Sequence, residues 1–404
     1  MLGIKLHNQK LTEILNLPNQ EVVGMQSFEG IGIVLHIESQ RKDGVCPRCG
    51  GKSDRIHENH YHTIQDLAWG VNDVYLRINA RQFKCEKCGK PFTEELEYKP
   101  LRRGYTNRLA NDVIEQVRGS TILAVSQRSG LSEYQIQNML DDLWEELNGK
   151  KPVGLKRLGI DEIAWRKGGK NFCAVLVNLD THKIIGLVKS RTKDELSKTL
   201  KGWGSEILEG VEYVSIDLWR PYETVVKELM PNVEVVADRF HVMKIVNEEL
   251  DSKRKEERRE SKKIENKLER EQIEEGLKNS KYILLRNEED LDEDQRGRLE
   301  KIKSVSPELA EMHRLKEDFR AIFEEEKTWA SGSLRLLDWL VAAQDKFTSA
   351  CKTIVNWIDE ITMYFECPIS NGCVEGINNR LKQLKHAAYG FRNFSNFVTR
   401  AMLF

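Results

Sequence analysis

The sequence predicts a multidomain α+β protein, with a metal-binding N-terminal module, a small helical domain and an α/β domain interrupted by a large helical insertion. Three observations support this prediction. Two Cys-x-x-Cys motifs lie in the first quarter of the chain, a strand, helix, strand pattern occupies residues 211–242, and a highly charged segment follows it. A chain of 404 residues is long enough for several cores. The expected boundaries are 1–97, 98–150, 151–247, 248–366 and 367–404.

The composition limits the environment and the partners of this chain. The formal net charge is -1, so nucleic-acid binding would depend on local basic patches. We find no apolar run long enough to span a membrane and no signal-peptide pattern at the N-terminus, and we therefore expect a soluble, intracellular protein without a membrane partner.

The paired cysteines predict a structural zinc site. CPRCGG and CEKCGK each place a glycine after a Cys-x-x-Cys turn, and two such turns can direct four thiolates at one ion. Two alternatives remain open: redox-active cysteine pairs, or a site in which a histidine between the motifs replaces one cysteine. We expect a closed four-cysteine zinc site. Its ligands would be Cys46, Cys49, Cys85 and Cys88.

Residues 98–110 carry four basic residues and no acid. This composition is typical of a linker that contacts phosphates, and Arg102 and Arg103 are the candidates for that contact. A solvated charged loop would have the same composition.

Residues 120–147 predict a helix-turn-helix. Gly130 would form the turn and Ser132 would cap the second helix. Gln135 and Asn138 lie on the exposed side of that helix, and amide side chains can read adenine edges. The helix lacks basic residues, so a packed helix pair without a DNA-reading role is the alternative.

The α/β domain begins after residue 150. Strand-like runs at 155–165, 171–180 and 183–190 precede a helix at 193–201, and a strand, helix, strand unit then closes the domain. This order of elements is that of a ribonuclease-H-like fold.

Three acids are the candidate catalytic residues. Asp161 and Asp217 end the first and fourth strands, and the carboxyl ends of strands are where α/β domains place their chemistry. Glu375 would lie in the early turns of a later helix. Glu162 and Asp238 are the rival acids, and alternation along a strand prevents Asp161 and Glu162 from facing the same site.

The segment from Glu248 to about Lys327 is charged but nearly neutral overall. Residues 251–300 contain sixteen acidic and fourteen basic side chains, a pattern typical of exposed, ion-paired helices. We expect a solvated helical arm, with dimer contacts as a second possibility.

The C-terminal segment combines an acid with basic residues. From Gly376 to the end there are five Lys or Arg residues and no acid. A carboxylate beside such a segment suits metal binding next to a phosphate backbone. The candidate DNA contacts here are Asn379, Arg380, Lys382 and Lys385.

If the three acids converge, they can bind Mg²⁺ or Mn²⁺ through hard carboxylate oxygens. Two such ions can activate water or a 3′-hydroxyl for attack on a phosphodiester.

The segments GIDEIAWRKG, SIDLWRPY, ADRFHV and SNGCVEGINNRLKQLKHAAYGFRNF, together with the CPRCG and CEKCG motifs, resemble the bacterial insertion-sequence transposases of the ISL-three family. The resemblance covers nearly the whole chain in the same order. It implies a zinc ribbon, a helix-turn-helix and a DDE catalytic domain whose triad falls on Asp161, Asp217 and Glu375.

By that resemblance, we expect a transposase that binds the terminal inverted repeats of its own element and cuts and joins double-stranded DNA, using Mg²⁺ or Mn²⁺ besides the structural zinc. It would act as a dimer or higher oligomer in the bacterial cytoplasm, associated with the nucleoid. The alternatives are a DNA-binding regulator derived from a transposase and a stand-alone nuclease.

Overall fold

The computed structural model describes residues 2–100, 103–166, 168, 171–369 and 371–403; for residues 2–6 it describes the backbone only. The chain divides into two compact units, Met1–Leu143 and Trp144–Phe404. Among the described residues, no helix is both long and apolar enough to span a membrane.

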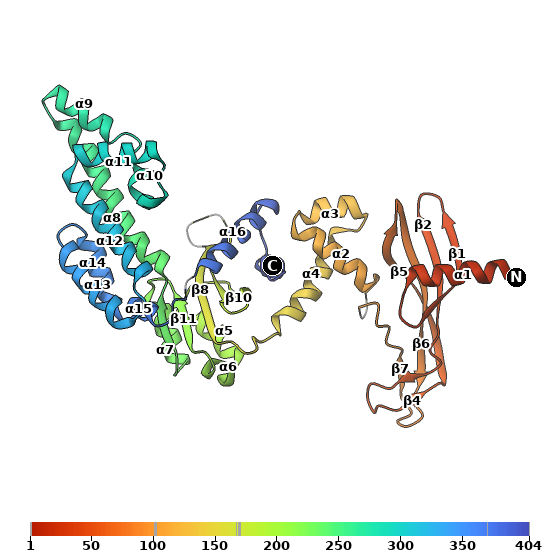
Figure 1. Cartoon of the computed structure of the whole chain (residues 1–404). Coiled ribbons are helices and arrows are strands. Elements are labelled where there is room, and N and C mark those ends of the chain that lie inside the picture. The colour runs from red at the N-terminus through yellow and green to blue at the C-terminus, as the bar shows by residue number, and fades with distance from the viewer. Residues whose placement is uncertain (1, 101–102, 167, 169–170, 370, 404) are drawn as a thin grey trace. The chain divides into compact units, whose positions relative to one another are not determined.

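The first unit is built on a five-stranded sheet with the order β1-β2-β6-β5, and β7 pairs with β6 (Figure 1). Its core is formed by aliphatic side chains such as Leu35, Leu76 and Ile78. A two-stranded sheet of β3 and β4 carries the first cysteine motif. The elements are α1 (Leu2–Leu15), β1 (Gln20–Phe28), β2 (Gly32–Ser39), β3 (Gly44–Val45), β4 (Lys52–Ser53), β5 (Ile56–Trp69), β6 (Asn72–Lys84) and β7 (Pro91–Thr93).

Three helices follow: α2 (Asn107–Arg118), α3 (Ile122–Ser129) and α4 (Glu133–Asn148), the last of which crosses the boundary between the units. Gly130 adopts a left-handed conformation, with φ 70°, and ends α3. The predicted turn between two helices is therefore present. The Ser132 hydroxyl accepts a hydrogen bond from Gln135 N (3.2 Å), which confirms its capping role.

The second unit contains a five-stranded sheet with the order β10-β9-β8-β11-β12. Strands β8, β9 and β10 pair antiparallel, whereas β11 is parallel to both β8 and β12. The predicted strands and helices of this domain are confirmed. Their bounds are β8 (Arg157–Ala164), β9 (Phe172–Asn178), β10 (Lys183–Val188), α5 (Lys193–Trp203), α6 (Ser205–Glu209), β11 (Tyr213–Ile216), α7 (Arg220–Leu229) and β12 (Glu234–Ala237).

Each face of this sheet has its own core. Alternate residues of a strand point to opposite faces, so Leu158 and Ile160 join the core on one face, and Ile163 joins the other. The first core continues into α5 and α7. The second is covered by α16 (Gly372–Ala387) and α17 (Phe394–Ala401).

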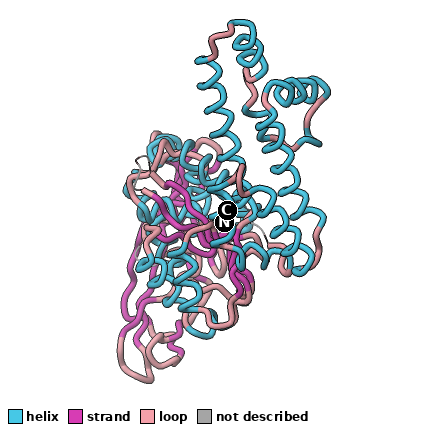
Figure 2. Tube along the Cα trace, turned by 90° about the vertical axis from the view of Figure 1, so that its left-hand side faces the viewer, coloured by secondary structure: helices cyan, strands magenta, loops and turns pink. Residues whose placement is uncertain are grey.

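Between β12 and α16 the chain is helical (Figure 2). In Figure 1, α8 runs outward from the sheet, and α9, α10 and α11 lie at its far end. The helices are α8 (Arg239–Glu260), α9 (Lys267–Gly276), α10 (Lys281–Leu285), α11 (Glu293–Val305), α12 (Pro307–Glu325), α13 (Trp329–Ala343), α14 (Thr348–Asn356) and α15 (Ile358–Thr362), with 3₁₀ turns at Ser261–Lys263, Glu288–Asp290 and Met363–Phe365.

The insertion is more than the solvated arm that its charge pattern predicts. Leu250, Leu284, Leu299 and Phe319 are buried, and they belong to the same core as one face of the sheet. The charged residues cover the outside of helices whose apolar stripes face one another. The insertion therefore packs as part of the α/β unit.

Candidate functional site

The four cysteine thiols of the two motifs converge in the first unit. Cys46 Sγ lies 3.8 Å from Cys88 Sγ, and Cys49 Sγ lies 3.5 Å from Cys85 Sγ. All four sulfurs lie within 4.8 Å of one another. Four sulfurs at the usual Zn–S distance form a tetrahedron with edges of about 3.8 Å. The site therefore fits a zinc ion held by cysteines alone.

Both cysteine motifs use the same backbone turn. Gly50 N donates to Cys46 O and Gly89 N donates to Cys85 O, each at 2.9 Å. Both glycines have positive φ, 67° and 69°, which side chains rarely tolerate. Of the histidines considered as alternative ligands, His57, His60 and His62 all lie on β5. None of the three joins the described cysteine cluster, which favours the four-cysteine site.

The candidate DNA-contacting residues of the first unit have partners within the protein. Arg103 forms an ion pair with Asp142 through two nitrogens, and Tyr105 donates to the same carboxylate at 3.1 Å. Gln135 Oε1 accepts hydrogen bonds from the Ser132 backbone and hydroxyl. Asn138 is half-buried. Arg102 lies outside the described residues.

In the second unit, two acids meet where the parallel pairing of β8 with β11 ends. Asp217 follows β11 directly, whereas Asp161 does not end its strand as predicted, because β8 continues to Ala164 in its pairing with β9. Ile160 of β8 pairs with Ile216 of β11, so the next residues, Asp161 and Asp217, lie side by side. His241, from the first turn of α8, reaches the same point. Ligand atoms of Asp161, Asp217 and His241 all lie within 4.8 Å of one another, and these three form the second group of metal-binding type among the described residues.

His241 lies between two carboxylates. Its Nδ1 is 2.9 Å from Asp238 Oδ2 and 3.0 Å from Asp217 Oδ1. Because one N–H donates to only one acceptor well, the Asp217 oxygen is left without a hydrogen bond, although it is buried. Burial lowers the pKa of His241, but the close contacts with the carboxylates of Asp217 and Asp238 outweigh this effect and raise the pKa to about 10.

The carboxylate of Asp161 is buried and crowded. Burial, followed by the negative charge of Asp217, raises its pKa to about 7. Its Oδ1 accepts from Glu162 N (2.6 Å) and its Oδ2 accepts from Asn378 Nδ2 (2.6 Å). A divalent cation would stabilise the negative charge of a buried carboxylate beside a half-buried one, in which one oxygen lacks a hydrogen bond. The residues present therefore fit such an ion.

The rival acids occupy different positions. Glu162 accepts a hydrogen bond from Tyr222 (3.0 Å) on α7 and pairs with Arg191, so it faces the side of the sheet opposite to Asp161. Asp238 is 2% exposed and accepts from the backbone N–H of Asn371 at 3.1 Å. Asp238 thus joins the start of α8 to the start of α16.

Helix α16 is held against β8 by several contacts. Asn371 Nδ2 donates to Ile160 O (3.4 Å), and Asn378 reaches Asp161 as described above. Gly159 of β8 permits this approach, since a Cβ there would lie 3.0 Å from a methyl group of Val374. Glu375 lies in the first turn of α16, is exposed, and lines a cavity together with Asp238. It lies outside the described group of Asp161, Asp217 and His241.

The four candidate DNA contacts on α16 divide into two kinds. Asn379, Arg380 and Lys382 are exposed, and Lys382 donates to Asn379 at 3.2 Å. Lys385 instead donates to the Ala164 carbonyl, and burial lowers its pKa. Three of the four candidates therefore remain accessible to a ligand.

The sequence places Asn378 three residues after Glu375, on the same side of the helix, and offers Asn371 as its cap. The contacts of Asn371 and Asn378 with β8, and the position of His241 between two acids, were not predicted.

Comparisons with known proteins agree with this architecture. A family model described as a transposase of the ISL3 type matches residues 158–401, and a model described as the zinc-finger of transposase IS204/IS1001/IS1096/IS1165 matches residues 42–88. The second match contains all four cysteines. The class of protein that the fold and the matches define is the insertion-sequence transposase.

Named relatives point to the same class. The chain is 24% identical to the transposase for insertion sequence element IS1001 of Bordetella parapertussis, over 92% of this chain and 91% of the relative. It is also 24% identical to the transposase for IS1557 of Mycobacterium tuberculosis, over 89% of this chain and 85% of the relative. Because the family model matches more than half of the sequence, this chain belongs to the ISL3 family of transposases.

Proposed function

We propose that this transposase cuts and joins DNA with a DDE site formed by Asp161, Asp217 and Glu375 on a ribonuclease-H-like domain. The observation that carries the proposal is the meeting of Asp161 and Asp217 where the pairing of β8 with β11 ends, with the helix that bears Glu375 joined to Asp161 through Asn378. Antiparallel β8, β9 and β10 followed by parallel β11 and β12 support the fold assignment.

Carboxylate oxygens of Asp161, Asp217 and Glu375 would hold Mg²⁺ or Mn²⁺. When bound, such ions lower the pKa of an attacking water or 3′-hydroxyl and stabilise charge on the phosphate. The protein contributes the positions of its acids. Asn378 fixes one oxygen of Asp161, and Asp238 fixes the N-terminal end of α16, so that Glu375 is presented beside the strand ends.

The charge of the site requires compensation before a phosphate can approach. His241 supplies part of it through its contacts with Asp217 and Asp238. Arg380 and Lys382 are exposed on the same helix as Glu375. We assign Arg380, Lys382 and Asn379 to contacts with the DNA backbone near the site, with Lys385 supporting α16 on β8.

The first unit would recognise the ends of the element. The zinc ribbon family and the turn between α3 and α4 support a DNA-binding module, in which Arg103, Gln135 and Asn138 are the candidate contacts. Since Arg103 and Gln135 have internal partners, DNA would have to displace Asp142 and Ser132 from them. Cutting two ends implies at least a dimer on DNA.

The test is cleavage and joining of a duplex that carries the element's own end, with Mg²⁺ or Mn²⁺. Wild type is compared with Asp217→Ala and Glu375→Ala, and with Glu274→Ala, which removes an exposed acid of α9, as the matched control. We expect the first two variants to bind the DNA without cutting or joining, and the control to behave as wild type.

Other outcomes select the alternative functions. A wild-type protein that binds the end tightly and never cuts is a DNA-binding regulator. A wild-type protein that cuts without producing joined strands is a nuclease. If Asp217→Ala or Glu375→Ala cuts as wild type does, the assignment of the acids is wrong.

A further inference from the structure

A groove leads away from the acidic site along α8. The cavity of about 930 Å³ begins at Glu375 and Asp238 and continues between α8 on one side and α10 and α12 on the other. Its volume is typical of a site for a ligand the size of a few nucleotides, and is too small for a duplex. Because Glu375 lines it, whatever occupies the groove lies next to the proposed site.

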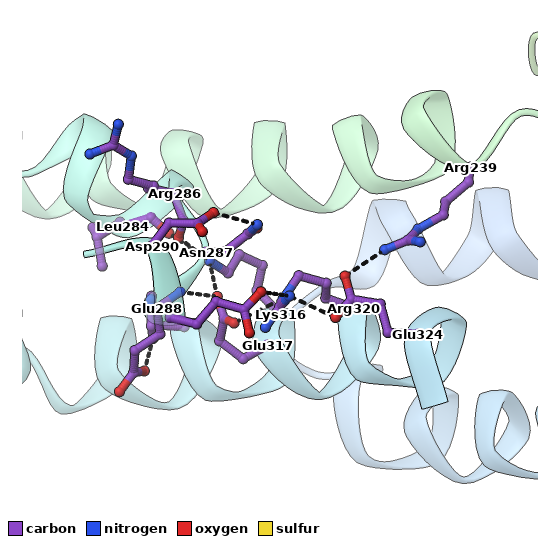
Figure 3. Close-up of polar contacts among 12 residues, drawn as sticks. Arg239, Leu284, Arg286, Asn287, Glu288, Asp290, Lys316, Glu317, Arg320 and Glu324 are labelled. Carbon is purple, nitrogen blue, oxygen red and sulfur yellow. Dashed lines mark hydrogen bonds and ion pairs between the residues drawn. The ribbon is translucent and has the colours of Figure 1, made fainter. Parts of the chain in front are cut away.

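The wall opposite α8 is fixed by ion pairs, which Figure 3 shows. Arg239 of α8 donates to Glu324 of α12 at 2.8 Å, and Arg320 donates to the same carboxylate at 2.7 Å. Lys316 is 1% exposed and donates to the backbone carbonyls of Leu284 (3.2 Å) and Arg286 (2.7 Å). These contacts hold α10 and α8 to α12, so the groove is formed before any ligand binds.

One side of the groove carries an exposed aromatic ring. Phe240 follows Asp238 by two residues and is 54% exposed, although its neighbour Val242 is buried in the core. Its ring meets the ring of His241 edge-on, with centroids 5.6 Å apart. The groove also contains the apolar side chains of Met243 and Leu285. An open aromatic face beside a phosphate-processing site suits a base that stacks on it.

Two lysines of the groove have weak partners. Lys244 lies one turn after Phe240, and its ion pair with Glu248 is 3.9 Å long. Lys281 of α10 contacts the ring of Tyr282, with its ammonium 5.6 Å from the ring centroid. By contrast, the acid Asp251 of the groove is compensated by Arg254 and Lys255, each at 2.7 Å. The two lysines can therefore accept phosphates without breaking a short ion pair.

We propose that this groove binds a few nucleotides of single-stranded DNA next to the phosphate that is cut, with a base stacked on Phe240 and phosphates at Lys244 and Lys281. This inference rests on the proposed function, since that function brings DNA to Glu375. It adds a strand-separating role to the helical insertion: the groove takes a single strand, so the base pairs next to the cut must open.

The test uses the full-length protein without divalent metal, so that no chemistry occurs. The probe is the element-end duplex with a short single-stranded extension that carries 2-aminopurine, whose fluorescence falls when it stacks on an aromatic ring. Phe240→Ala should remove the quenching and weaken binding of the extension by about 5- to 150-fold. Phe240→Trp should restore both.

The lysines are tested by Lys244→Glu and Lys281→Glu, with Lys267→Glu on exposed α9 as the matched control. Each groove variant should bind the extension more weakly. The slope of its binding constant against salt concentration, on logarithmic axes, should indicate release of about one counterion fewer, and the control should change neither quantity. A fully duplex probe should lose less affinity than the extended probe, because the cost of opening its base pairs offsets much of the gain from the groove.

Two results would overturn the proposal: unchanged quenching and affinity in Phe240→Ala, or an equal loss of affinity for the fully duplex probe. An assay of cleavage by wild type distinguishes a failure of the groove proposal from a failure of the proposed function. If wild type cuts while Phe240→Ala binds and cuts as wild type does, only the groove proposal fails. If wild type never cuts but Phe240 still quenches the probe, the groove stands and the catalytic proposal fails.

Discussion

Asn378 offers a sharp test of how the candidate site is organised. Its amide donates to Asp161 Oδ2 at 2.6 Å, and both side chains are buried. Asn378→Ala removes this donor and leaves one oxygen of a buried carboxylate without a partner. A hydrogen bond to a charged group contributes about 1.5–3 kcal/mol. If this free energy is needed to hold Asp161 in its reactive orientation, the cleavage rate should fall about 10- to 150-fold.

The assay is the single-turnover rate of cleavage of the element-end duplex, at saturating DNA and metal. Gln383→Ala is the matched control, because Gln383 lies on the same helix, is exposed, and is not among the candidate DNA contacts. We expect the control to stay within about threefold of wild type, which is less than the loss of one neutral hydrogen bond.

Folding must be separated from catalysis in this comparison. An unsatisfied buried acceptor also destabilises the fold by about 1–3 kcal/mol, so urea unfolding of both variants is measured at the assay temperature. The reasoning is refuted if Asn378→Ala is folded and cleaves as fast as Gln383→Ala, while Asp217→Ala is inactive.

Three further predictions concern other parts of the chain. Cys46→Ser removes one proposed ligand and should abolish stoichiometric zinc, as measured by metal analysis; retention of zinc would contradict the four-cysteine site. The variant should also bind the element end more weakly, because Cys46 belongs to the small core around Phe83. Burial lowers the pKa of His313 to about 4, below its unfolded value of 6.5. The stability that the buried, neutral imidazole contributes is therefore complete above pH 6.5 and is lost as the pH falls towards 4. Between pH 7.5 and pH 5, His313→Leu should lose about 2 kcal/mol less stability than wild type in urea unfolding, and an equal loss would refute the assignment. Gly159→Ala should displace α16, because its Cβ would lie 2.8 Å from Leu179 and 3.2 Å from the Asn371 oxygen; cleavage should fall well below that of Gly202→Ala, where a Cβ meets nothing.

The strands of the α/β domain could be predicted because their signal is local. Val214 and Ile216 are buried β-branched residues in a short run that ends in an acid, and the observed β11 spans Tyr213–Ile216. The cysteine motifs were equally informative, since a tight turn and two thiols three residues apart determine one half of a metal site.

Two other features left local signals that the predictions did not use. Helix α1 was not predicted, although Leu11 and Leu15 have helical spacing and are buried. Gln135, a candidate DNA contact, also bonds Ser132 in the arrangement of a capping box, which the spacing S-x-x-Q could have indicated.

The candidate site likewise combines features that the sequence predicts with features that it does not. Asp217 lies directly after β11, as predicted, whereas Asp161 lies inside β8 instead of at its end. The partners of both acids were not predicted. The bond from Asn378 to Asp161 joins residues 217 positions apart, and the partner of such a long-range contact is chosen by the packing of whole helices.

The insertion has a consequence for how the site forms during folding. The bond between Asn371 and Asp238 joins residues 133 positions apart, and for a flexible chain the length-dependent entropy of closing such a loop is about 4 kcal/mol. The folding of helices α8 to α15 offsets most of this entropy loss, because these helices share a core with the sheet and bring the chain back to the edge of the sheet from which α8 starts. A destabilising change deep in the insertion, for example at Leu299, would then release α16 from the strand ends while β8 and β11 stay paired. The insertion thus holds both ends of the segment that leads to α16, and its loosening would move the helix that bears Glu375 away from β8.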